Sequence, residues 1–271
     1  DNKVHTSTDI ETALNAPYLG DIPKTKTQNK VVVSEDDRSS ASEAFRLLRT
    51  NLNFMLASIQ SVSKTIFITS TVPSEGKTFI SLNLAAVLAM PDKKVLLIGA
   101  DIRKPKIVQY LNRAVGKGLT HFLIDTALKP TDVIETIEEL KIDVIQSGIS
   151  APNPAELLMN ERFKELVSYA KAHYDYIIVD TPPVGLVSDT LLISEMADLF
   201  LYVVRANYLE KRMLEIPKKL YNNKRLPNMA MLLNDSDPKA GYGGYGYGYG
   251  YGYGYGYGEH VKKPWWKRMF S

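Results

Sequence analysis

The sequence predicts an α/β fold in which a doubly wound, mainly parallel sheet is flanked by helices. Six short runs rich in Val and Ile alternate with segments of helical periodicity. These runs are apolar on both faces, which is typical of central parallel strands covered by helices. The expected strands are residues 65–70, 95–100, 142–146, 176–180, 199–205 and 229–234.

The segments between these runs have the 3.6-residue periodicity of helices that connect parallel strands. They cover residues 77–90, 154–173, 189–196 and 208–221. A further helix is expected at 39–57, ahead of the first strand, with Ser40 or Ser42 at its N-terminal cap.

The two ends of the chain differ from this central region. Residues 1–29 are polar and are expected to be a linker into a domain at residues 30–239. Within the linker we expect a short helix near residues 9–14 and a turn at residues 18–23. The composition changes abruptly near residue 240, so residues 240–271 are expected to form a separate tail.

Composition narrows the functional class. The 271 residues carry a net charge of only +3, with both signs mixed, which argues against a dedicated nucleic-acid binder. The absence of cysteine excludes disulfides and cysteine–zinc sites. No apolar run reaches the roughly 20 residues of a membrane span, and no signal peptide is visible. Because the sequence does not begin with Met, we expect it to be part of a longer protein.

A phosphate-binding loop is predicted between the first strand and the helix at 77–90. Its end, Gly76-Lys77-Thr78, has a chemical reason for each residue. Glycine lets the backbone curl around phosphate, and loop N–H groups attract the anion. The lysine reaches the β- and γ-phosphates, and the threonine hydroxyl ligates Mg²⁺. The residues expected to bind nucleotide here are Pro73, Ser74, Glu75, Gly76, Lys77, Thr78 and Phe79.

This loop departs from the usual G-x-x-x-x-G-K-[ST] pattern, because Thr71 stands at the first glycine position. The alternative is a chance Gly-Lys-Thr on a surface turn, and the flanking strand and helix argue against it. We therefore expect a P-loop NTPase-like domain that binds ATP or ADP with Mg²⁺.

Two carboxylates follow predicted strands. Asp101 comes after the run at 95–100, and Asp180 ends the run at 176–180. Ligands bind at the carboxyl ends of strands in open α/β sheets, and P-loop proteins place a Mg²⁺-associated carboxylate there. Either aspartate alone reads as a turn residue. Together with the loop, they predict a Mg²⁺ site formed by Thr78, Asp101 and Asp180.

The tail is almost pure Tyr-Gly from residue 241 to residue 258 and holds half of the chain's 16 tyrosines. Alternating glycine makes such a segment costly to order, so we expect it to be disordered. Residues 262–270 are basic and contain two tryptophans, which suits a solvated end or an anionic membrane surface. The tail tyrosines are Tyr242, Tyr245, Tyr247, Tyr249, Tyr251, Tyr253, Tyr255 and Tyr257.

Taken in order, these motifs resemble the cytoplasmic domain of bacterial tyrosine autokinases, the polysaccharide co-polymerases of capsule and exopolysaccharide systems. The resemblance covers about residues 9–258. Each motif is weak alone, and their order makes them specific together. They are the loop from Ser70 to Thr78, the motif Asp101-Ile102-Arg103-Lys104-Pro105, the segment Pro152–Leu158, the Asp180–Pro183 motif, the tyrosine cluster, and an E-x-x-R-x-x-R helix matched by Glu43, Arg46 and Arg49.

The resemblance implies a protein-tyrosine autokinase that depends on ATP and Mg²⁺. The catalytic residues it implies are Lys77, Asp101, Arg103 and Asp180. It also implies that Asn234 contacts adenine, although a turn asparagine is an equally good reading of that residue alone.

The same resemblance implies an assembly. The tail tyrosines would accept phosphate in trans within a ring of subunits, an octamer in the family, with Glu43, Arg46 and Arg49 at the ring interface. From the residues alone, a solvated helix face with i,i+3 ion pairs is the simpler interpretation of those three. Eight phosphotyrosines would add roughly −12 to −16 charges, which we expect to drive the ring toward monomers.

Partners and location also follow from the resemblance alone. The implied partners are a cognate tyrosine phosphatase and the polysaccharide polymerisation and export machinery, and nucleic acid is not among them. The expected location is the cytoplasmic face of the inner membrane, as the cytosolic part of a larger membrane protein.

Two positions depart from related patterns. Gly99 stands where the family's D-x-D-x-R motif has its first aspartate, a candidate for activating the tyrosine hydroxyl, so that role falls to Asp101 or to positioning alone. Val72 stands where ParA/MinD-type ATPases have a signature lysine, which counts against an ATPase switch of that class. A nucleotide-binding scaffold with little kinase activity is the other alternative.

Overall fold

The computed structural model describes residues 2–27 and 29–237, which lie in one compact unit. Within them an eight-stranded sheet has the order β1-β8-β7-β2-β6-β3-β5-β4. All neighbouring strands are parallel except the β4–β5 pair. The strands are β1 (Tyr18–Pro23), β2 (Lys64–Ser70), β3 (Val95–Gly99), β4 (Glu135–Ile137), β5 (Ile142–Ile145), β6 (Tyr176–Asp180), β7 (Leu199–Arg205) and β8 (Ala230–Ser236).

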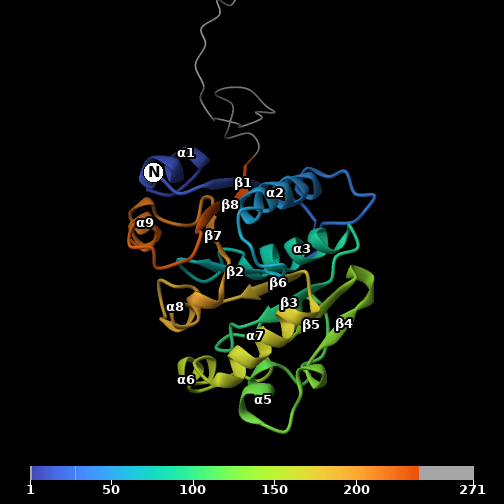
Figure 1. Ribbon diagram of the computed structural model, residues 1–271. Helices are drawn as coiled ribbons and strands as arrows, with labels where there is room; N and C mark the ends of the chain where they lie inside the picture. The colour runs from blue at the N-terminus through green and yellow to red at the C-terminus, as the bar shows by residue number, and fades with distance from the viewer. Residues whose placement is uncertain (1, 28, 238–271) are drawn as a thin grey trace, which may run out of the picture. The chain divides into compact units, whose positions relative to one another are not determined.

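Helices cover both faces of this sheet, as expected for a doubly wound fold (Figure 1). One face packs against α2, α3 and α4, and the other packs mainly against α5, α6 and α7. The α-helices are α1 (Ser7–Ala13), α2 (Ser40–Leu56), α3 (Lys77–Ala89), α4 (Ile107–Tyr110), α5 (Leu119–Ile124), α6 (Pro154–Leu158), α7 (Glu161–His173), α8 (Asp189–Leu192) and α9 (Glu215–Asn222). Short 3₁₀ helices are η1 (Pro130–Asp132), η2 (Glu138–Leu140), η3 (Ser194–Met196) and η4 (Lys211–Leu214).

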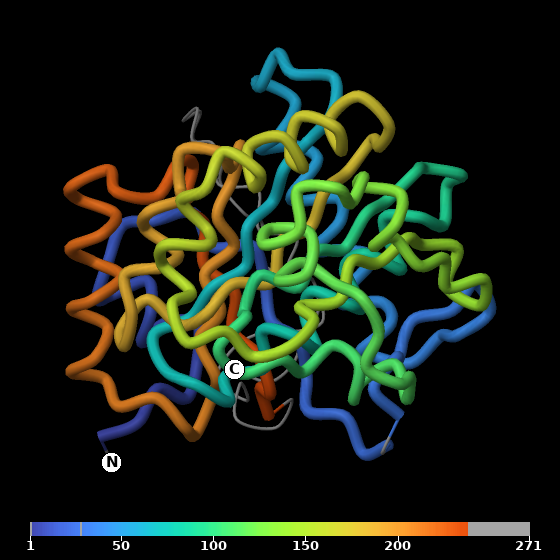
Figure 2. The backbone as a smooth tube through the Cα atoms, turned by 90° about the horizontal axis from the view of Figure 1, so that it is seen from below, coloured from blue at the N-terminus to red at the C-terminus, as the bar shows by residue number. Residues whose placement is uncertain are grey.

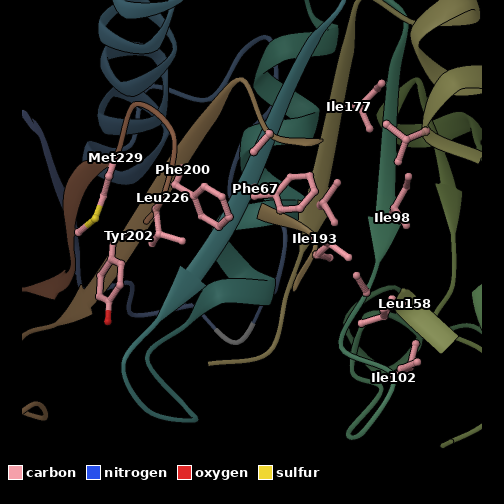
Figure 3. Packing of buried hydrophobic residues seen from close by; sticks show 14 of the residues in the cluster. Phe67, Ile98, Ile102, Leu158, Ile177, Ile193, Phe200, Tyr202, Leu226 and Met229 are labelled. Atoms are coloured by element: carbon pink, nitrogen blue, oxygen red, sulfur yellow. The ribbon is translucent and has the colours of Figure 1, made fainter. Parts of the chain in front are cut away.

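The strands are apolar on both faces because each face has its own core. In β2, Ile66 and Ile68 face the core below α2 and α3, while Phe67 faces the opposite core. Figure 3 shows Phe67 beside Phe200, whose ring centroid is 5.3 Å away in an edge-to-face contact. Burying each such side chain stabilises the fold by roughly 1.5–3 kcal/mol. This double core holds the central strands rigid below the site.

The N-terminal segment is the main correction to the expected fold. The turn expected at residues 18–23 is strand β1, which pairs in parallel with β8 at the edge of the sheet. The two segments lie side by side, blue against red, in Figure 2. Leu19 and Ile22 are buried, so their hydrophobic contacts outweigh the local turn preference of Gly20 and Pro23. The proline is tolerated because the strand is an edge strand.

Helix boundaries differ from the expected ones at their caps. The helix expected at 154–173 is broken into α6 and α7, because the Asn160 side chain accepts a hydrogen bond from the backbone N–H of Arg162 at 3.0 Å. Helix α2 is capped by Ser39, whose Oγ accepts from the Ser42 N–H, rather than by Ser40 or Ser42. None of the helices in residues 2–27 and 29–237 combines the length and apolarity needed to cross a bilayer.

Candidate nucleotide and phosphoryl-transfer site

The phosphate loop joins β2 to α3, where the sequence placed it. Gly76 has φ +96°, a conformation that favours glycine. A Cβ added at Gly76 would lie 2.1 Å from Nδ2 of Asn234, which donates a hydrogen bond to the Glu75 carbonyl at 2.9 Å. Only glycine fits here, because the end of β8 is packed against the loop.

Glu75 braces this loop from inside. Its buried carboxylate accepts hydrogen bonds from the backbone N–H of Val72 at 2.8 Å and of Arg205 at 3.2 Å. Burial raises the pKa of Glu75 to about 7, although both hydrogen bonds and the nearby Lys77 oppose the shift. The Glu75 side chain is therefore a support of the loop, and any contact with nucleotide falls to its backbone.

Lys77 and Thr78 begin helix α3 at the base of the site. Thr78 Oγ1 donates a hydrogen bond of 2.7 Å to Oδ2 of Asp180, at the end of the adjacent strand β6. Burial lowers the pKa of Lys77, while the charges of Asp180, Asp101 and Glu75 raise it. Burial likewise raises the pKa of Asp180 to about 6, against the opposing effect of Lys77. The lysine charge and the aspartate thus stabilise each other in a desolvated pocket.

A divalent cation fits this arrangement. Oδ1 of Asp180 is buried and has no hydrogen-bond partner among the described residues, although buried polar atoms are nearly always paired. Mg²⁺ in phosphate sites uses one or two carboxylates together with phosphate oxygens and water. The described residues contain no cluster of three or more His, Cys, Asp or Glu side chains that would bind a metal without such partners. The donor set therefore suits Mg²⁺ with a nucleotide rather than a closed protein site.

The loop after β3 brings in Asp101 and Arg103. Asp101 Oδ1 accepts from the backbone N–H of Lys104 at 3.1 Å, which curls the loop over the pocket. The Arg103 guanidinium forms two hydrogen bonds with the buried Asp189 carboxylate, at 2.7 and 3.0 Å. Asp189 begins α8 and was not expected from the sequence. It lies 86 positions after Arg103, so only the folded sheet brings the two together.

Gly99 ends β3 directly opposite Asp180 on β6. An added Cβ would lie 2.6 Å from Oγ and 3.0 Å from the backbone N of Ser147, and 2.9 Å from Cδ1 of Ile107. The space for an aspartate side chain is thus occupied by neighbouring groups. Asp101 is the acidic residue that lines the pocket on this side.

These groups surround a pocket of about 450 Å³ at the carboxyl ends of the central strands. The residues that line it come from the end of β1 and the segment that follows it, from the phosphate loop, from the loop after β3 and from the end of β8. On the far side Arg205 pairs with Asp235 at 3.0 Å and donates to the Ser74 carbonyl, fixing the outer wall. The predicted site residues that line the pocket are Pro73, Ser74, Gly76, Lys77, Thr78, Phe79, Asp101, Arg103 and Asn234.

The proposed interface residues lie elsewhere, on α2. Arg46 binds the Glu43 carboxylate at 2.6 Å and also donates to the backbone carbonyls of Ser34 and Asp37. Arg49 donates to the Val87 carbonyl of α3 at 2.8 Å. Each arginine therefore has an intramolecular role in fixing α2. The eight tail tyrosines lie outside the described residues, and their role as acceptors stays a prediction.

Chemically, the arrangement can hold a nucleotide triphosphate and stabilise charge on its terminal phosphate. Lys77, the loop N–H groups and the N-terminus of α3 supply positive potential from one side. Asp180 lies beside them at the base of the site, bound to Thr78, and Asp101 lines the same pocket. This is an arrangement for phosphoryl transfer, which depends mainly on alignment and electrostatics.

Comparisons with known proteins agree with this geometry. The family model for the AAA domain matches residues 63–211. Tyrosine-protein kinase YwqD of Bacillus subtilis (strain 168) is 39% identical over 188 residues, which cover 69% of this chain and 77% of that protein. Tyrosine-protein kinase ptk of Acinetobacter johnsonii is 33% identical over 252 residues, covering 88% of this chain and 34% of that protein. The chain thus spans about a third of this longer relative.

A solved structure gives the same result. The kinase domain of the Escherichia coli tyrosine kinase ETK is 30% identical, with a TM-score of 0.77, and the match covers 91% of this chain and 100% of that domain. Both the identity and the coverage extend well beyond the phosphate loop. The chain therefore belongs to the family of bacterial tyrosine-protein kinases.

Proposed function

We propose that this kinase transfers the γ-phosphoryl group of ATP to tyrosines in the Tyr-Gly tail of a neighbouring copy of the chain, with Mg²⁺ as cofactor. The observation that carries the proposal is the unpaired Oδ1 of the buried Asp180, whose Oδ2 accepts a hydrogen bond from Thr78, because Thr78 and Lys77 line the same pocket as Asp101. The acceptor comes from the sequence, which concentrates eight tyrosines in one segment.

In this mechanism each pocket residue has one role. Lys77 and the loop N–H groups bind the phosphates and counter the charge that develops on the transferred group. Thr78 and Asp180 would hold Mg²⁺, with Asp101 nearby, and the ion would neutralise phosphate charge. Asp101 accepts the proton of the tyrosine hydroxyl as the oxygen attacks phosphorus. Arg103, fixed by Asp189, holds the loop that carries Asp101.

The nucleotide base belongs at the end of β8 in this proposal. The Asn234 amide nitrogen is already bound to the Glu75 carbonyl, which leaves its Oδ1 to accept a hydrogen bond from an adenine amino group. The pocket wall beside it, formed by Arg205 and Asp235, is fixed by their ion pair.

The wider role we propose follows the family resemblance. The kinase would act in a ring, with α2 at the interface, and would regulate capsule or exopolysaccharide synthesis and export through ring assembly and disassembly. Its partners would be a cognate tyrosine phosphatase and the polysaccharide machinery, at the cytoplasmic face of the inner membrane. A tail of 18 residues, 241–258, spans at most about 60 Å when extended, which is enough to reach a neighbouring subunit.

The ATPase-switch alternative has less support. Val72, at the position of the ParA/MinD lysine, packs against the hydrophobic core and is absent from the pocket lining. Among the described loop residues 71–78, the only lysine that lines the pocket is Lys77, which belongs to the Gly-Lys-Thr motif itself.

The test is incubation of the purified chain with γ-labelled ATP and Mg²⁺, followed by mapping of the label. We expect label on tail tyrosines, no label in a Lys77→Met variant, and none when all eight tail tyrosines are phenylalanine. Mixing the Lys77→Met chain with the all-phenylalanine chain tests transfer in trans, because only the first has acceptors and only the second has activity. Release of free phosphate without labelled tyrosine would favour an ATPase, and neither product would favour a scaffold.

A further inference from the structure

The pocket rim carries more positive charge than its carboxylates neutralise. Among the described residues, six basic and two acidic side chains line the pocket. Two arginines among the six are paired with aspartates. Lys30, Lys104 and Lys106 form no ion pair with any carboxylate in residues 2–27 and 29–237. Three cations at the mouth of the site thus remain without a carboxylate partner among the described residues.

Two of these lysines lie on the loop after β3, close to Asp101 and Lys77. The backbone N–H of Lys104 binds the Asp101 carboxylate, so this residue adjoins the group that we assign as proton acceptor. Lys106 lies near enough to Lys77 for its charge to lower the pKa of that residue, in addition to the larger effect of burial. Both lysines follow β3 on the loop that curls over the pocket.

The nucleotide does not account for these charges. Lys77, the loop N–H groups and the N-terminus of α3 already provide for its phosphates. Lys30 completes the rim from the opposite segment, and its Nζ lies 5.4 Å from the ring centroid of Tyr110, which also lines the pocket. The rim therefore combines cations that no described carboxylate neutralises with an aromatic ring, which suits an aryl phosphate.

We propose that Lys104 and Lys106, with Lys30 and Tyr110 beside them, form a second anion site for a phosphotyrosine adjacent to the tyrosine being modified. This site rests on the proposed function, which supplies the tyrosine-rich peptide as substrate. The sequence of the tail fits it, because tyrosines recur at every second residue from Tyr245 to Tyr257. In an extended bound peptide, such tyrosines project to the same side and lie about 7 Å apart.

The site makes one modification promote the next. A phosphotyrosine carries about −1.5 to −2 charges, and a flexible lysine can follow its phosphate through small shifts of the peptide. Once one tyrosine is modified, its phosphate holds the segment at the rim and presents the neighbour two residues away to Asp101. Phosphorylation then proceeds along the repeat rather than at random positions.

The experiment measures binding of two labelled peptides by fluorescence anisotropy. They are Gly-Tyr-Gly-Tyr-Gly-Tyr-Gly and the same peptide with its central tyrosine phosphorylated. The protein is the full chain with all eight tail tyrosines changed to phenylalanine, saturated with Mg²⁺ and a non-hydrolysable ATP analogue. We expect the phosphopeptide to bind at least about tenfold more tightly, as charge-assisted contacts to two lysines provide.

Two paired variants locate the effect. Lys104→Gln with Lys106→Gln should abolish the preference for the phosphopeptide. Lys93→Gln with Lys94→Gln, exposed residues before the other end of β3, should retain it with the same change in net charge. Equal binding of both peptides overturns the proposal before any variant is made. A preference that survives the Lys104/Lys106 change also overturns it.

This result is separable from that of the label-mapping experiment. The anisotropy measurement reports binding and needs no phosphoryl transfer. If the label-mapping experiment finds no labelled tyrosine but the anisotropy measurement finds a preference for the phosphopeptide, the kinase mechanism is rejected and the anion site is kept. If tyrosines are labelled but both peptides bind equally, the kinase mechanism is kept and the anion site is rejected.

Discussion

At the scale of single residues, Gly76 is the position where the loop tolerates least change. Gly76→Ala would place a methyl group on Nδ2 of Asn234 and force a left-handed conformation on alanine. We expect affinity for an ATP analogue to fall at least about tenfold, measured by isothermal titration.

A matched control separates strain from the clash with Asn234. Gly20 also has positive φ, at +133°, but an added Cβ there has nothing within 4 Å. Gly20→Ala should lower the melting temperature slightly and leave nucleotide affinity unchanged. Normal affinity in Gly76→Ala would show that the contact between the loop and β8 does not shape the site.

Glu75 gives a prediction about pH. Its folded-state pKa of about 7 lies above its ordinary value of 4.5, because burial favours the neutral form. Between these two pH values the folded chain binds more protons at Glu75 than the unfolded chain does, so this group's contribution to stability is present at low pH and is lost as pH rises. The loss is about 3 kcal/mol across the window.

Denaturant unfolding at several pH values checks this, with Glu75→Gln as the comparison. The unfolding free energy of the wild type should fall relative to the variant between pH 4.5 and about 7. Asp180 has a raised pKa of the same sign, but it is present in both proteins and cancels in the difference. Parallel pH profiles would mean that Glu75 is already ionised at the low end of the window.

At this scale, the sequence predicted the site residues that are neighbours in the chain. Gly76, Lys77 and Thr78 are adjacent and follow a strand, so their motif predicts their shared position. The inward turn of Glu75 and the buried Asp189 were missed, because their partners lie 130 and 86 positions away in the chain. Such contacts depend on strand order, which the sequence pattern does not specify.

At the scale of elements, the Arg103–Asp189 pair joins the loop after β3 to α8. Arg103→Gln would leave a buried carboxylate without its cation. We expect a loss of about 1–3 kcal/mol in unfolding free energy, below the penalty for a fully buried pair because Arg103 is 40% exposed. Kinase activity should fall with it, as the Asp101 loop loses its anchor.

A double-mutant cycle tests this contact. Asp189→Asn combined with Arg103→Gln should cost less than the sum of the two single changes, since the unpaired charge is removed. Arg212→Gln serves as control, because Arg212 and Glu210 form an exposed pair expected to contribute under about 1 kcal/mol. If the two single changes in unfolding free energy simply add in the double variant, Arg103 and Asp189 contribute no more than an exposed surface pair.

The elements that the sequence predicted best are the central strands. The strand at residues 176–180 and the strand at 199–205 have the expected boundaries, because continuous burial on both faces leaves an unbroken apolar run. Strand β1 was read as a turn, and β4 was missed. Both lie at the edges of the sheet, where strands are short and partly exposed and their pattern is correspondingly weak.

At the scale of the whole molecule, phosphorylation should change the state of assembly. The proposed modification of eight tail sites adds roughly −12 to −16 charges, whereas the unmodified chain carries +3. We expect the fully modified chain to sediment as a smaller species than phosphatase-treated protein at equal concentration, and the difference to shrink at high salt. Lys77→Met, which cannot modify itself, should match the phosphatase-treated sample. Identical masses under all conditions would contradict this regulation.

Assembly could not be predicted from the helix motif alone. Arg46 and Arg49 satisfy a motif that the family places at an interface, yet within one chain they bind carbonyl groups of residues 34–37 and 87. Helix α2 therefore needs these arginines for its own position, so loss of assembly in an arginine variant would have to be separated from a shift of the helix.

The tight packing around Gly99 also restricts the mutational routes open to this lineage. A single exchange of Gly99 for aspartate would meet Ser147 at once and cost about 1–3 kcal/mol in overpacking. Removal of the Ser147 hydroxyl alone would not make room, because Cδ1 of Ile107 lies 2.9 Å from the added Cβ and would have to be lost as well. Gly99→Asp is therefore tolerated only in a background in which both neighbours have already changed, so position 99 is epistatic to positions 107 and 147.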